Sequence, residues 1–240
     1  MKSLIVSDLH GSFDHSWIKD AKEAGIERLV CLGDYDEPKV LKQVLDLKMK
    51  KIVLIGNHDY HLCRGLNLTS NDLHNEIDYY DLWEDTPEAK FVIDASAKPI
   101  RKKGLRAGIK IYESINGKRV VYVHGGLCSS FPELNNDLDP YLWARLLHHP
   151  HESNILPNFL RMKKENIDIM FRGHDHKQAL ITGDNRDLSL PILEGDVNVL
   201  LEETKFEKGK RYIVCLGKFM QGSYAVYDSS NQSVKFGTMK

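Results

Sequence analysis

Side chains that bind metals and move protons recur in five short stretches of the chain, each containing glycine. The stretches are Asp8-Leu9-His10-Gly11, Gly33-Asp34, Gly56-Asn57-His58-Asp59, His124-Gly125-Gly126 and Gly173-His174-Asp175-His176. Each stretch follows a short apolar run typical of a buried strand. One such stretch, like one buried histidine, is usually an ordinary structural feature, but five in one chain indicate a shared site. Ligands of α/β sheets bind beyond the carboxyl ends of strands, so we expect the stretches to meet there.

The residue types in these stretches suit transition metals. Imidazole, carboxylate and carboxamide groups without a thiolate favour Mn, Fe, Zn, Co or Ni over a structural Cys-zinc site. Residues two apart in extended chain point the same way, so Asp8 can converge with His10, and His174 with His176. The candidate ligands are too many for one ion and suit two ions that share a bridge. Two such ions can clamp both oxygens of a displacement at phosphorus and lower the pKa of a bridging water.

The elements that must position these side chains alternate between strands and helices. Strands expected at 4–7, 28–32 and 52–55, with helices at 14–24 and from Pro38, predict a β-α-β-α-β order. Asn116-Gly117 predicts a hairpin between strands at 109–114 and 118–123. The rest of the chain predicts helices at 139–147 and 158–165, a strand at 167–171, and successive strands from 178 with turns at 183–185 and 229–232.

Residues 60–110 differ in composition from their surroundings. They contain Tyr79, Tyr80 and Trp83 and a basic run from Arg101 to Arg106. We interpret 60–110 as a cap-like helical insertion that overhangs the site, with a helix near 71–81; a peripheral helical pair is the alternative. The chain otherwise shows no repeat and no low-complexity tract, which predicts a single domain over 1–240.

Composition excludes several classes of protein. The 240 residues are 42% hydrophobic and 28% charged with a formal net charge of −1, which counts against non-specific binding of nucleic acid. The N-terminus turns polar too soon for a signal peptide, and no apolar run approaches the roughly 20 residues of a membrane span. The four cysteines form no CxxC pair and fit reduced thiols. We therefore expect a cytoplasmic protein without a membrane or nucleic-acid partner; no feature predicts its oligomeric state.

Taken together, the five stretches resemble the calcineurin-like metallophosphoesterases from Met1 to about His176, with a looser likeness over 221–228. The resemblance implies an α+β (α/β) fold, a four-layer αββα sandwich of two mixed β-sheets with helices outside. It implies metal-dependent hydrolysis of a phosphoester or phosphoanhydride with two divalent transition ions, manganese first among them. The implied ligands are Asp8, His10, Asp34 and His176 for one ion, and Asn57, His124, His174 and the bridging Asp34 for the other.

The same resemblance assigns acid–base roles to two further residues. His58 is implied as the general acid that faces the leaving-group oxygen. Asp59 is implied as the carboxylate that orients His58 and keeps it protonated.

The subfamily pattern limits the substrate. His124-Gly125-Gly126-Leu127 and Asp8-Leu9-His10-Gly11 resemble the protein-phosphatase-like branch, and 56–62 resembles its symmetrical diadenosine tetraphosphatases. These matches imply a nucleotide, a dinucleoside polyphosphate or a phosphoprotein as substrate. That branch often places a phosphate-gripping arginine after its GDxxD motif, whereas here Pro38 follows Glu37. The departure puts phosphoproteins and dinucleoside polyphosphates in doubt.

Two residues are candidates for the missing phosphate contact. Arg64 lies six residues past His58, although it also fits a solvated helix position, and His61 also fits a capping or packing role. The cluster of His148, His149 and His151 fits a solvated loop better than a third metal site.

Two other functions compete with a phosphatase. A binding module that has lost its chemistry should lack ligands or the acid, and here every position is filled. A nuclease or other phosphodiesterase acting on a polymer would need a basic path for its backbone, which the net charge does not favour.

Overall fold

Strand β1 (Lys2–Val6) shows how the sequence builds the fold, because its alternating side chains enter two different cores. Leu4 and Val6 pack with residues of neighbouring helices, whereas Ile5 packs between two sheets. Strands that are buried on both faces have continuously apolar sequences, as β1 does from Leu4 to Val6. The computed structural model describes residues 1–13, 21–63, 83, 86–129, 139–147, 154–184, 192–194 and 203–238.

The first sheet has eight strands in the order β11-β14-β13-β1-β2-β3-β5-β4. Strands β1, β2, β3 and β5 run parallel to one another, and β13 joins β1 in antiparallel fashion. The remaining bounds in this sheet are β2 Arg28–Cys31, β3 Lys50–Leu54, β4 Ile100–Lys102, β5 Leu105–Gly108, β11 Thr204–Lys205, β13 Ser223–Asp228 and β14 Ser233–Thr238.

The second sheet has six strands in the order β10-β9-β12-β8-β7-β6. Its central strands β7, β8 and β12 are parallel, and β6 and β9 pair in antiparallel fashion at either side of them. The bounds are β6 Lys110–Ile115, β7 Lys118–Val123, β8 Ile169–Arg172, β9 Ala179–Asp184, β10 Ile192–Glu194 and β12 Lys210–Cys215.

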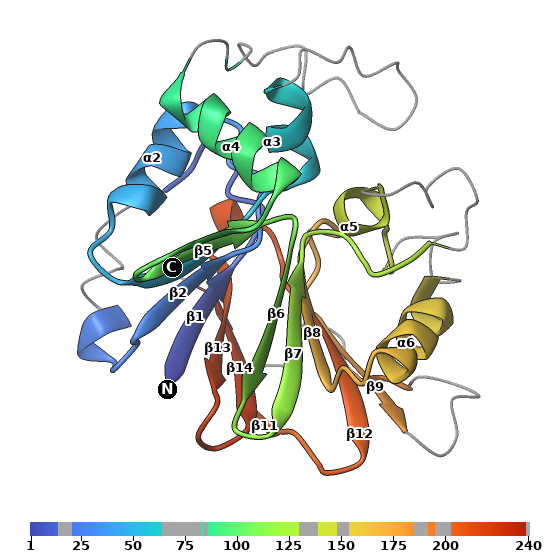
Figure 1. Cartoon of the computed structure of the whole chain (residues 1–240). Helices are drawn as coiled ribbons and strands as arrows, with labels where there is room; N and C mark the ends of the chain where they lie inside the picture. The colour runs from blue at the N-terminus through green and yellow to red at the C-terminus, as the bar shows by residue number, and fades with distance from the viewer. Residues whose placement is uncertain are drawn as a thin grey trace.

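Helices lie outside the two sheets, as Figure 1 shows, and give the sandwich that the resemblance implied. Three clusters of buried residues correspond to its three interfaces. Helices α2 (Pro38–Asp46) and α4 (Pro87–Ala97) pack on the first sheet, the two sheets pack on each other, and α6 (Ile155–Lys164) packs on the second sheet. The remaining described helices are α3 (Asn57–Leu62), α5 (Asp139–Trp143) and the 3-10 turn η4 (Phe219–Gln221).

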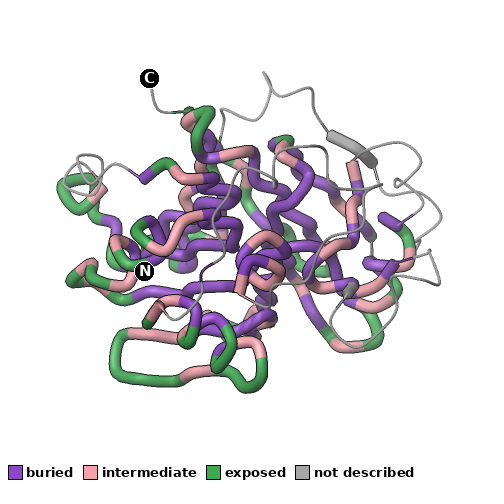
Figure 2. Tube along the Cα trace, turned by 90° about the horizontal axis from the view of Figure 1, so that it is seen from above, coloured by how far each residue is buried: buried purple, intermediate pink, exposed green. Residues whose placement is uncertain are grey.

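Burial follows this layering, with the strands buried and the exposed segments at the outer turns (Figure 2). Among the described residues, no helix is long and apolar enough to cross a membrane.

The predicted hairpin is confirmed: Asn116 and Gly117 both have positive φ, as its tight turn requires, and join β6 to β7. The turn before β14 is likewise confirmed, since β13 and β14 pair across 229–232. The expected helix at 139–147 ends already at Trp143, and the helix expected at 158–165 begins earlier, at Ile155. Gly183 belongs to β9 rather than to a turn.

The interpretation of 60–110 as a helical insertion was wrong for its second half. α4 lies in the connection between β3 and the β4–β5 hairpin, and β4 and β5 complete the edge of the first sheet. The basic run therefore belongs to a strand edge. The helix expected near 71–81 and most of the one at 14–24 lie outside the described residues, so the cap over the site stays a prediction.

Candidate metal centre

Five parallel strands end at one edge of the sandwich, and the loops that follow them pack backbone against backbone. A Cβ atom on Gly33 would lie 2.4 Å from the backbone nitrogen of Gly56, and one on Gly56 would lie 2.1 Å from Oδ1 of Asp34. Only glycine permits these approaches. The backbone N–H groups of Asp8 and His10 donate to the carbonyl oxygens of Gly33 and Asp34. The loops after β1, β2 and β3 are thereby fixed side by side.

Three pairs of site residues share an unusual backbone conformation. Asp8 and His10, Asp34 and Asp36, and His174 and His176 all have φ between 43° and 68°. A non-glycine residue in this left-handed region is uncommon, and clusters of them mark sites where the surroundings enforce strain. Five of these six residues contribute to the two ligand groups described next, and the sixth, Asp36, contacts His10 and His58.

The first group of candidate ligands comes from the loops after β1, β2 and β8. Donor atoms of Asp8, His10, Asp34 and His176 all lie within 4.8 Å of one another. Nε2 of His176 lies 3.1 Å from Nε2 of His10 and 3.3 Å from Oδ1 of Asp8. Because Nδ1 of His10 donates to a carboxylate, its Nε2 presents a lone pair to the centre of the group.

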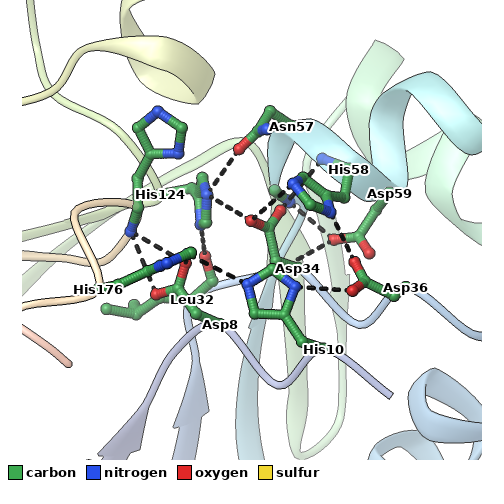
Figure 3. A network of polar contacts seen from close by, with 12 residues as sticks. Asp8, His10, Leu32, Asp34, Asp36, Asn57, His58, Asp59, His124 and His176 are labelled. Atoms are coloured by element: carbon green, nitrogen blue, oxygen red, sulfur yellow. Dashed lines mark hydrogen bonds and ion pairs between the residues drawn. The ribbon is translucent and has the colours of Figure 1, made fainter. Parts of the chain in front are cut away.

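The second group shares Asp34 with the first. Its members Asp34, His124 and His174 also have donor atoms within 4.8 Å of one another. Nδ1 of His124 donates to the carbonyl oxygen of Leu32 at 2.8 Å, which leaves Nε2 facing the centre. That Nε2 lies 2.9 Å from Oδ1 of Asn57 and 3.1 Å from Oδ2 of Asp34. The structure thus brings together all seven ligands that the resemblance implied, in the two groups that it implied. Figure 3 labels six of them, Asp8, His10, Asp34, Asn57, His124 and His176.

Two buried atoms at the middle of the site test whether metals fit. Nε2 of His174 has no hydrogen-bond partner among the described residues, and Oδ2 of Asp34 has an ion pair with Nε2 of His124 at 3.1 Å. A buried polar atom without a partner is costly, and a cation bound to both groups would satisfy Nε2 of His174 and neutralise the carboxylate of Asp34. The donors are nitrogen and oxygen with no thiolate, which suits divalent transition ions. The residues present therefore fit two ions that share Asp34.

His58 is the second residue of α3 and lies beside these groups. Its Nδ1 donates to Oδ1 of Asp36 at 2.8 Å, and Oδ2 of the same carboxylate accepts from Nδ1 of His10 at 2.7 Å. Figure 3 shows Asp36 between the two imidazoles. Nε2 of His58 lies 4.0 Å from Oδ2 of Asp34, so this nitrogen faces the metal groups.

Asp59 has a different role from the one the resemblance assigned to it. Its carboxylate accepts hydrogen bonds from the backbone N–H groups of Asp34, Tyr35 and Gly56, at 2.8 to 2.9 Å. It thereby ties the loop after β2 to the start of α3. The prediction that Asp59 orients His58 was wrong, since Asp36 makes that contact.

The carboxylates set the charge of the imidazoles around them. Burial lowers the pKa of His58, but the charges of Asp34 and Asp36 and the hydrogen bond to Asp36 outweigh it and raise the pKa to about 9. Burial also opposes the shift of His124, whose pKa is raised to about 8 by Asp34. His174 differs, because burial and the charge of Arg145 hold its pKa well below the usual range. A neutral His174 is ready to bind a metal.

The segment from α5 to 147 forms another wall of the site. The N–H groups of Gly125 and Gly126, next to His124, donate to the carbonyl oxygens of Tyr141 and Pro140. This anchoring brings Trp143 close to His174, with ring centroids 6.0 Å apart. It also brings the half-buried Arg145 within 3.4 Å of the His174 carbonyl oxygen, measured from Nη1.

Of the two phosphate contacts suggested by the sequence, one can be placed. His61 lies on α3 with its ring centroid 4.9 Å from that of Trp143, so it packs against this wall. Arg64 lies outside the described residues, as do His148, His149 and His151.

Sequence reasoning missed Asp36, Trp143 and Arg145. Asp36 follows Asp34 by two residues, the same spacing as in the other two pairs, and that spacing was a signal for it. Trp143 and Arg145 carry no such local signal.

The chain belongs to the calcineurin-like phosphoesterase superfamily, whose domain model matches residues 1–188. It is accordingly a metallophosphoesterase, a hydrolase that acts on phosphoester bonds. No match was found among curated proteins.

Solved structures with the same fold have distant sequences. A metallophosphoesterase from Sphaerobacter thermophilus is 19% identical with a TM-score of 0.61, over 100% of this chain and 88% of that one. A hypothetical protein from Pyrococcus horikoshii OT3 is 12% identical with a TM-score of 0.62 and the same coverage. An archaeal phosphodiesterase is 17% identical with a TM-score of 0.50, over 100% of both chains. These likenesses establish the fold.

Proposed function

We propose that the protein hydrolyses a small phosphorylated molecule, such as a nucleotide, with two divalent ions and with His58 as general acid. The observation that carries the proposal is the pair of ligand groups that share Asp34, with Nε2 of His58 facing them. The first ion would be held by Asp8, His10, Asp34 and His176, and the second by Asp34, Asn57, His124 and His174.

When bound, two divalent ions would neutralise the phosphoryl oxygens and lower the pKa of coordinated water. Manganese is the ion we expect first, as the family resemblance implies, and the oxygen and imidazole ligands also suit Fe, Zn, Co or Ni. His124 and His10 are prepared for this role by hydrogen bonds at Nδ1, which direct their Nε2 lone pairs inwards.

His58 would deliver a proton to the leaving oxygen. Asp36 accepts the hydrogen bond from Nδ1 and stabilises the protonated ring, so the second proton sits on Nε2 at the side of the metal groups. A general acid must hold its proton where the leaving group departs, and this orientation meets that requirement. His58 is thus assigned the acid role and Asp36 the role of orienting it.

Arg145 would bind the phosphoryl group from the side of the second ion. Its guanidinium is near His174, is only half-buried and makes no ion pair among the described residues. An arginine can bind two phosphate oxygens at once. Arg145 would thus replace the phosphate-binding arginine that is missing after Glu37. Nucleotides and other small phosphoesters are therefore the substrates that we propose.

The cysteines bear on the location of the protein, and His58 bears on the competing functions. All four cysteines are free, which supports a reducing compartment, and we propose the cytoplasm. A binding module without chemistry would not need the protonated His58 aimed at the ligand groups.

The test compares leaving groups. With Mn bound, activity is screened on p-nitrophenyl phosphate, on alkyl phosphates including nucleotides, and on phosphodiesters and dinucleoside polyphosphates. His58→Ala should retain metal and lose roughly 10²–10⁴-fold in kcat on alkyl phosphates. It should lose much less on p-nitrophenyl phosphate, whose leaving group needs little protonation.

The control is His124→Ala, which removes a ligand and should reduce metal content and activity on both substrates. Equal losses on both leaving groups in His58→Ala, or loss of metal, would remove His58 from the acid role.

A further inference from the structure

Asp36 occupies a strained position on which the acid role of His58 depends. Its φ is 63°, in the left-handed region that side chains other than glycine rarely adopt. Such a conformation persists only where the surrounding contacts enforce it. The carboxylate is held by His10 and His58, at 2.7 and 2.8 Å. These two contacts hold the carboxylate of Asp36 and leave its strained backbone to be held by a different contact.

Trp83 makes that contact. Its indole Nε1 donates to the carbonyl oxygen of Asp36 at 3.0 Å, across 47 positions in sequence. The Trp83 side chain is 1% exposed, so the hydrogen bond is shielded from water. A buried carbonyl oxygen that lost this donor would have no solvent to replace it.

Trp83 also contacts the helix that carries His58. Its backbone N–H donates to the carbonyl oxygen of Leu62, the last residue of α3, at 3.3 Å. Thr86 Oγ1 donates to the Trp83 carbonyl oxygen at 3.2 Å and caps the start of α4 through the N–H of Ala89. Trp83 is therefore fixed against both elements whose relative position sets the contact between Asp36 and His58.

We infer that Trp83 is a positioning residue for the acid: its indole N–H holds the backbone of Asp36 so that the carboxylate can orient His58 and His10 together. The inference rests on the proposed function for its kinetic consequence, but its structural consequence is independent of catalysis. Packing alone would require the ring of Trp83 and would not require its N–H group.

The experiment removes the N–H and keeps the ring. Site-specific incorporation of β-(benzothien-3-yl)alanine at position 83 replaces the indole N–H by sulfur at nearly the same volume. Trp83→Phe is the simpler companion variant. Tyr122→Phe is the matched control, because it also removes one buried hydrogen-bonding group, the hydroxyl that accepts from Arg28, in the core between the sheets.

Two measurements are made on each protein. In metal-free protein, the solvent exchange of the imidazole Nδ1 protons of His10 and His58 is followed by NMR. We expect both to exchange about tenfold faster in the benzothienyl variant, since the acceptor carboxylate is no longer held. With Mn bound, kcat on an alkyl phosphate should fall about tenfold with KM unchanged, and kcat on p-nitrophenyl phosphate should change much less.

Unchanged Nδ1 exchange in the benzothienyl variant would overturn the inference, as would equal changes in the Tyr122→Phe control. An equal loss of kcat on both leaving groups would also overturn it, because it would indicate a general structural effect. If His58→Ala shows no leaving-group dependence, the proposed function fails, and the Nδ1 exchange still decides the role of Trp83.

Discussion

Asp36→Asn is the substitution that best distinguishes the roles of the two carboxylates near His58, those of Asp36 and Asp59. It removes the negative charge that accepts the hydrogen bond from Nδ1 of His58 and changes little in volume. Asp59→Asn is the matched variant, because Asp59 lies next to His58 in sequence and bonds to backbone N–H groups instead. The measured quantity is the pKa of His58 in metal-free protein.

The expected shift follows from the contacts. Burial lowers the pKa of His58; the charge of Asp34, the hydrogen bond and charge of Asp36, and the charge of Asp59 raise it, to about 9 from an ordinary 6.5. Asp36 supplies two of these contributions, and an opposite charge in contact shifts a pKa by about 1 to 3 units. We expect Asp36→Asn to lower the pKa of His58 by about 1 to 2 units and Asp59→Asn to lower it less.

The raised pKa of His58 should also make the free energy of unfolding depend on pH. His58 has a folded pKa above its unfolded value, so the stability it contributes is complete below pH 6.5 and is lost as the pH rises through about 9. At about 1.4 kcal/mol per unit, the full contribution is about 3 kcal/mol. Asp36→Asn should flatten this part of the pH dependence of the free energy of unfolding.

The assay is a pH titration of the His58 ring protons by NMR, with urea unfolding at several pH values beside it. A His58 pKa that stays near 9 in Asp36→Asn and falls in Asp59→Asn would refute the assignment and restore the role that the resemblance implied for Asp59.

Three further outcomes follow from the same geometry. Asp34→Asn should weaken the binding of both ions, because Asp34 belongs to both ligand groups. Elemental analysis of this variant that finds one ion still at full occupancy would contradict the shared ligand. Arg145→Ala should raise KM about tenfold and leave the metal content unchanged, whereas an unchanged KM would remove Arg145 from phosphate binding. His58→Ala should lose kcat on alkyl phosphates far more than on p-nitrophenyl phosphate, and uniform losses would contradict a general acid at this position.

The sequence predicted the parts of the site that depend on local order along the chain. Apolar runs that end in polar residues placed the ligand loops after β1, β2, β3, β7 and β8, and parallel strands bring such ends to one edge. The hairpin at Asn116 was predictable because its turn residues alone determine it.

The errors arose where distant segments decide the outcome. The role of Asp59 depends on how closely the loops after β2 and β3 approach, which the contact of Gly33 with Gly56 determines. Strand β5 was missed because its short segment becomes a strand only by pairing with β3. Arg145 reaches the site through the anchoring of α5 on the loop after β7, which no local pattern encodes.

The central claim is that two ions bind in two groups that share Asp34, with His58 beside them and not bound to either. Crystals grown with manganese and measured at the manganese absorption edge test it directly. The account predicts two anomalous peaks, one among Asp8, His10, Asp34 and His176 and one among Asp34, Asn57, His124 and His174. A single peak, or a peak among His10, Asp36 and His58, would contradict it, because those three residues also form a group able to hold an ion.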